Sequence, residues 1–88
     1  MTHNTEITNQ VRTLDPEVEA MAIKWMVSFQ VDSLMKEREL SKAALAKQMR
    51  TSRSSLDRLL DPTNTSITLH TLERAAQVLG KRLKIEFA

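Results

Sequence analysis

The stretch that decides the fold reads SKAALAKQMRTSRSSLDRLL and runs from Ser41 to Leu60. Ser41 and Ser52 each stand where a helix N-cap is expected, because a serine hydroxyl can accept a hydrogen bond from an N–H group of the first turn. Apolar residues follow both serines at helical spacing, namely Ala44, Leu45 and Met49, then Leu56, Leu59 and Leu60. The stretch predicts two short helices, over residues 42–49 and 52–61, joined by a tight turn.

The apolar residues of these two helices can pack against each other across the turn. Four of them are large (Leu45, Met49, Leu56 and Leu59), and Ala46 offers a small side chain where the backbones approach closely. The second helix should stop near Asp61, because Pro62 disfavours helical geometry in the residue before it. An alternative interpretation is a plain helical bundle in which these residues serve packing alone.

Before this stretch, Asp15 and Pro16 predict the start of a long helix, since aspartate caps and proline fits the first helical position. An apolar stripe then continues to about Arg38 and includes Val18, Met21, Ala22, Trp25, Met26 and Phe29. We expect this stripe to cover the other helices as part of the core. Residues 1–14 are polar and are expected to form a flexible arm or a short strand.

After this stretch, residues 61–67 predict a polar loop, and Thr68 is expected to cap a further helix that ends at Gly80. Beyond Gly80 the pattern alternates as in a half-buried strand, with Leu83, Ile85 and Phe87 on one face. An isolated strand leaves its backbone groups unpaired. We therefore expect residues 81–88 to pair with the segment around residues 6–11 or, in a dimer, with another subunit.

Composition limits the function classes that remain open. The chain has 88 residues, enough for one helical domain over residues 15–80. It has no cysteine, one glycine and two distant histidines, His3 and His70, so no metal site, cofactor site or nucleophilic centre is expected. No signal peptide or membrane-spanning run is recognisable. We expect a cytoplasmic protein that is not an enzyme.

The segment from Ser41 to Leu60, together with TLHTLERAAQVLG at residues 68–80, resembles the Cro/C1-type helix-turn-helix family, also called the Xre family. The resemblance covers roughly residues 34–80. It implies a mainly α domain of four to five helices, here with a short C-terminal β-strand, whose second motif helix enters the DNA major groove. One departure is Arg50, which stands in the turn where many members have glycine.

The resemblance also implies roles for individual residues. The expected base contacts are Arg53, Ser54 and Asp57, at the exposed start of the recognition helix. The expected phosphate contacts are Lys42, Lys47, Ser52, Arg58 and Thr63. Residues 36–58 carry seven basic and three acidic residues, a balance that suits an anionic partner.

The ending LGKRLKIEFA resembles antitoxins of the HigA and HipB types, which repress their own operon and neutralise a toxin. These resemblances imply a repressor that binds a double-stranded operator. The alternation of Leu83, Ile85 and Phe87, with no strand partner evident in the chain, predicts a homodimer held together by these residues, which would suit a palindromic operator. The acidic first third, with Trp25 on its helix, could instead face a basic toxin. Two alternatives stay open: a toxin-neutralising module with weak or no DNA binding, and a phage-type repressor without a toxin.

Overall fold

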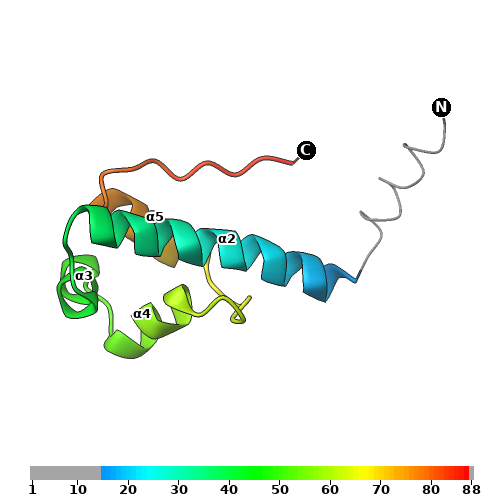
Figure 1. Ribbon diagram of the computed structural model, residues 1–88, viewed down its shortest axis with the longest axis horizontal. Coiled ribbons are helices and arrows are strands. Elements are labelled where there is room, and N and C mark those ends of the chain that lie inside the picture. The colour runs from blue at the N-terminus through cyan, green and yellow to red at the C-terminus, as the bar shows by residue number, and fades with distance from the viewer. Residues whose placement is uncertain (1–14, 88) are drawn as a thin grey trace.

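The computed structural model describes residues 15–87, and the calls made for residues 1–14 lie outside this range. Figure 1 shows that the described chain is mainly α, as expected from the sequence. Its four helices are α2 (Pro16–Glu37), α3 (Lys42–Met49), α4 (Arg53–Leu60) and α5 (Leu69–Val78). No helix between residues 15 and 87 combines the length and the apolar character needed to cross a bilayer.

Each helix begins at the capping residue that the sequence indicated. The side-chain oxygens of Asp15, Ser41, Ser52 and Thr68 accept hydrogen bonds of 2.9 to 3.2 Å from N–H groups two or three residues ahead. These bonds satisfy donors that have no partner inside the helix. The predicted helix starts are therefore confirmed.

The core lies between the last half of α2 and the three shorter helices. Helix α3 packs on α4 and on α5, and α2 packs on α4. Leu45, Leu56, Leu59 and Leu79 are almost completely buried, and Ala46 is buried with them. The large apolar residues expected to join the two motif helices do so, and α2 adds Val31 and Met35 to the same cluster.

Two residues that stood out in the sequence have a positive φ. Arg50 has a φ of 56°, so the turn after α3 is left-handed even without glycine. Gly80 has a φ of 70° and closes α5 as expected. A Cβ atom at Gly80 would lie 2.5 Å from Nη2 of Arg38, the end of a flexible side chain that can move, so it is the positive φ that favours glycine there.

The expected core role of the apolar stripe on α2 is wrong. Val18, Met21, Trp25, Met26 and Phe29 are all exposed, although the rings of Trp25 and Phe29 stack with centroids 5.6 Å apart. The first half of α2 extends beyond the short helices, which are too small to cover it (Figure 1). The side of α2 that carries Lys24, Ser28, Val31 and Met35 is buried, and Phe29 lines a shallow depression beside Lys81 and Arg82.

The expected C-terminal strand is not formed within residues 15–87. Residues 81–87 instead run beside α2, where Lys81 and Arg82 line one shallow depression together with Phe29 and Leu34. Ile85 and Phe87 are exposed. A strand needs a second strand for its backbone hydrogen bonds, and the described part of the chain offers none.

Candidate nucleic-acid interface

Helix α4 presents one polar face to solvent. Leu56 and Leu59 anchor it in the core, whereas Arg53, Ser54 and Asp57 are exposed on its other side. This separation follows from helical spacing, because residues three or four apart share a face. The structure therefore leaves the three predicted base-contact residues free to meet a DNA groove, and their roles stay a prediction.

Two of these three residues already contact each other. Nε of Arg53 lies 3.6 Å from Oδ1 of Asp57, and both side chains are more than half exposed. An exposed ion pair one turn apart contributes little to stability. The contact lies on the outer face of α4.

The predicted phosphate-contact residues are all exposed, but two of their hydroxyls are occupied. The Ser52 hydroxyl caps α4 and lies 3.1 Å from Oγ of Ser55. The Thr63 hydroxyl donates to Oδ1 of Asp61 over 2.8 Å. Lys42, Lys47 and Arg58 remain the groups best suited to phosphate, because each carries a full charge on a long exposed side chain.

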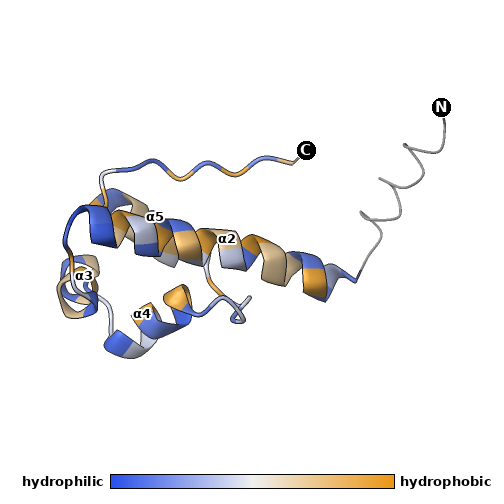
Figure 2. Ribbon diagram, viewed as in Figure 1, coloured by the Kyte–Doolittle hydropathy of each residue, from blue (hydrophilic) through white to orange (hydrophobic). Residues whose placement is uncertain are grey.

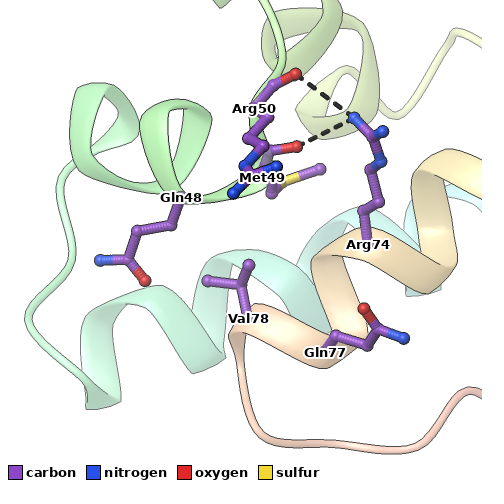
Figure 3. Close-up of a pocket in the computed structure, with 6 residues that line it drawn as sticks. All are labelled: Gln48, Met49, Arg50, Arg74, Gln77 and Val78. Carbon is purple, nitrogen blue, oxygen red and sulfur yellow. Dashed lines mark hydrogen bonds between the residues drawn. The ribbon is translucent and has the colours of Figure 1, made fainter.

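Arg74 holds the turn between α3 and α4 in place. Its Nη1 donates to the carbonyl oxygen of Met49 over 3.1 Å and to that of Arg50 over 3.3 Å, as Figure 3 shows. These carbonyls belong to the end of α3, where backbone acceptors lack helical partners and the dipole favours a cation. Arg74 thus supports the left-handed Arg50 from α5.

Lys24 and Ser28 likewise donate hydrogen bonds to backbone carbonyl groups at the end of α4. Nζ of Lys24 donates to the carbonyl oxygens of Arg58, at 2.9 Å, and Asp61, at 2.6 Å. Oγ of Ser28 donates to the carbonyl oxygen of Leu59 over 3.1 Å. Both side chains are buried, so α2 fixes the end of the helix that would read DNA.

The carboxylate of Asp61 lies near the buried charge of Lys24 and helps to stabilise it. Burial lowers the pKa of Lys24, and the nearby carboxylate of Asp61 partly restores it. The pKa of Asp61 is itself lowered, mainly by hydrogen bonds from Thr63 and also by Lys24. Within the described residues, every buried side-chain nitrogen and oxygen has a hydrogen-bond partner.

Sequence reasoning missed Lys24, Ser28 and Arg74 as supporting residues. The spacing of Lys24 and Ser28 carried a usable signal, because it continues the face of α2 that Val31 and Met35 bury. Arg74 carried no such signal. Its carbonyl partners lie 24 and 25 residues away in the sequence.

Comparison with known proteins identifies the domain that this geometry belongs to. The family model of the Cro/C1-type HTH DNA-binding domain matches residues 30–84, which is more than half of the chain. Neither the curated proteins nor the solved structures gave a significant match. The matched range includes the end of α2, the whole of α3, α4 and α5, and the start of the tail. On this match, the chain belongs to the Cro/C1-type helix-turn-helix DNA-binding domain family.

Proposed function

We propose that the protein is a sequence-specific transcriptional repressor that binds a palindromic operator as a two-fold homodimer. The observation that carries this proposal is the exposed polar face of α4, which belongs to a matched DNA-binding domain. A single motif of this kind reads few base pairs, whereas a dimer places two recognition helices about 34 Å apart on successive major grooves. This function requires no catalysis, and a protein that performs it acts in the cytoplasm, where operator DNA is accessible.

In the proposed complex, Arg53 reads base edges while lysines set the position of the protein. A guanidinium can pair bidentately with O6 and N7 of guanine, and Asp57 holds Arg53 in a suitable orientation. Lys42 and Lys47 on α3 lie exposed before the turn and are suited to the flanking phosphates. Arg74 positions the turn of the motif, and Lys24 and Ser28 position the end of α4, without contacting DNA.

A gel-shift titration tests this proposal. The intact protein is titrated onto DNA from directly upstream of its own gene and onto a shuffled duplex of the same length and composition. Specific binding requires an affinity for the upstream DNA at least roughly a thousandfold above that for the shuffled duplex. Equal affinity for both duplexes would contradict a sequence-specific repressor.

A second candidate function is supported by α2. An antitoxin must bind another protein, and the exposed stripe beside Glu17 and Glu19 offers an apolar surface with an acidic margin. The resemblance of the last ten residues to HigA-type and HipB-type antitoxins points the same way. Co-purification with the product of the neighbouring gene tests this role separately from DNA binding, since a toxin-neutralising module need not shift any duplex. A phage-type repressor would shift DNA and capture no such neighbour.

A further inference from the structure

The exposed large apolar side chains are concentrated on two neighbouring segments. The α2 stripe comprises Val18, Met21, Trp25, Met26 and Phe29, and the tail of residues 81–87 adds Ile85 and Phe87. The two segments meet where Phe29 and Arg82 line the same depression. Figure 2 shows hydrophobic residues recurring along the uncovered part of α2 and alternating with polar ones along the tail.

We infer that the α2 stripe and the tail together form the surface on which a second copy of this chain docks. The inference rests on the proposed function for the need to bring two recognition helices together. It goes beyond the proposed function in assigning the exposed apolar residues of α2, together with the tail, to the interface.

The size of the surface fits a stable dimer. The α2 stripe with Ile85 and Phe87 exposes on the order of 800 Å² of side-chain surface, close to the ~800 Å² that each partner buries in a standard interface. A monomeric protein rarely exposes a contiguous apolar patch of this area. Trp25 and Phe29, which stack on each other, form a rigid aromatic centre of the kind that carries binding energy.

The tail also has the backbone that a second copy could pair with. Among the described residues, the hydrogen bond from Lys81 N to Ala76 O ties the start of the tail to α5, and residues 82–87 take part in no strand ladder. Two identical tails related by a two-fold axis would run antiparallel. Their alternating Leu83, Ile85 and Phe87 would then share one face, which would lie against the α2 stripes.

The charges on the two segments are complementary between copies. The first turn of α2 carries Glu17 and Glu19, preceded by Asp15, whereas the tail carries Lys81, Arg82 and Lys84 against Glu86. No ion pair joins these two groups within residues 15–87 of one chain. A second copy can place its basic tail near the acidic start of α2, which favours the pairing of unlike segments.

This surface leaves the DNA-binding side accessible. Lys24 and Ser28 face α4, and at 100° per residue Met26 and Phe29 lie about 100° or more around α2 from both of them. Figure 1 accordingly shows α4 and the tail on opposite sides of α2. A dimer formed through the α2 stripe would keep both recognition helices exposed.

Sedimentation of the full chain across the micromolar range tests the inference, with Trp25 as a second reporter. It is the one tryptophan in the sequence, so its emission should shift to shorter wavelength as dimers form and bury the ring. Trp25→Glu should weaken dimerisation by roughly tenfold or more. Ile85→Glu, in the tail, should do the same and lies outside every helix, so it cannot act by unfolding one.

Leu69→Glu is the matched control, because Leu69 is as exposed as Trp25 but lies outside both segments. It should leave the dimer unchanged, and circular dichroism should stay helical in all three variants. A wild-type monomer throughout the range, or a dimer that both glutamate variants retain, overturns the inference. The inference is also overturned if the protein stays monomeric and its α2 stripe binds the product of the neighbouring gene.

The gel shift on upstream DNA separates this inference from the proposed function. A dimer that shifts no DNA would contradict the repressor and leave the interface standing. Specific binding by a protein that stays monomeric would contradict the interface alone.

Discussion

Two successive parts of α2 bury opposite kinds of residue. Near its end, Val31 and Met35 enter the core as the apolar spacing predicts. Before them, over residues 24–29, Lys24 and Ser28 are buried while Trp25 and Phe29 are exposed. The difference lies in what each part of the helix meets, since the end meets leucine side chains and residues 24–29 meet the carbonyl groups that end α4. An apolar stripe therefore marks a surface suited to burial without saying what buries it.

The largest expected effect tests the apolar half of this comparison. Leu56→Ala should lower the free energy of unfolding by about 2 to 5 kcal/mol, because Leu56 is fully buried and its removal leaves a cavity. Urea titration followed by circular dichroism measures the loss. Leu69→Ala, at an exposed position, should change stability by less than about 0.5 kcal/mol. Equal losses in both variants would contradict the core described for α3, α4 and α5.

The second prediction tests the polar half. Lys24→Ala should lower the free energy of unfolding by about 1 to 3 kcal/mol, because the carbonyl oxygens of Arg58 and Asp61 lose their donor. It should also weaken operator binding, since the end of α4 is then less well fixed. Lys36→Ala on the same helix is the control, because Lys36 is exposed and forms an exposed ion pair with Asp32. A Lys24 variant as stable as the Lys36 variant would show that this contact is dispensable.

The third prediction sharpens the comparison at the DNA-binding face. Arg53→Ala should weaken specific binding by about 1 to 3 kcal/mol and relax the preference at one base position. Lys42→Ala should weaken binding to operator and shuffled DNA alike and reduce the log-log salt slope by about one. Gel shifts at several salt concentrations distinguish the two. Unchanged binding in both variants would rule out this docking face.

The smallest expected effect concerns Asp61, which links Lys24 to the loop after α4. Hydrogen bonds from Thr63, with a smaller effect of Lys24, hold the pKa of Asp61 below its ordinary value of 3.8. A lowered carboxyl pKa stabilises the folded state above about pH 3.8, and this contribution is lost as the pH falls through the folded-state pKa. Asp61→Asn should therefore lose less stability than the wild type on acidification from pH 5, as thermal unfolding at successive pH values would measure. An identical acid profile would contradict the assigned shift.

What the sequence determined by itself was local. The capping residues Ser41, Ser52 and Thr68 predicted the starts of α3, α4 and α5, because a cap acts within three residues of itself. The leucine spacing predicted the core of the same helices, and the resemblance predicted the family. Arg50 stood out from the sequence as the residue in the turn where many members have glycine, and its φ is positive there.

The tertiary structure alone decided the contacts that join distant segments. Lys24 meets carbonyl groups 34 and 37 residues away, and Arg74 supports a turn on another helix. Whether the tail forms a strand likewise depends on a partner, and within residues 15–87 there is none to supply the second half of the ladder. Periodicity shows which residues share a face, but the surface opposite that face is set only when the chain has packed.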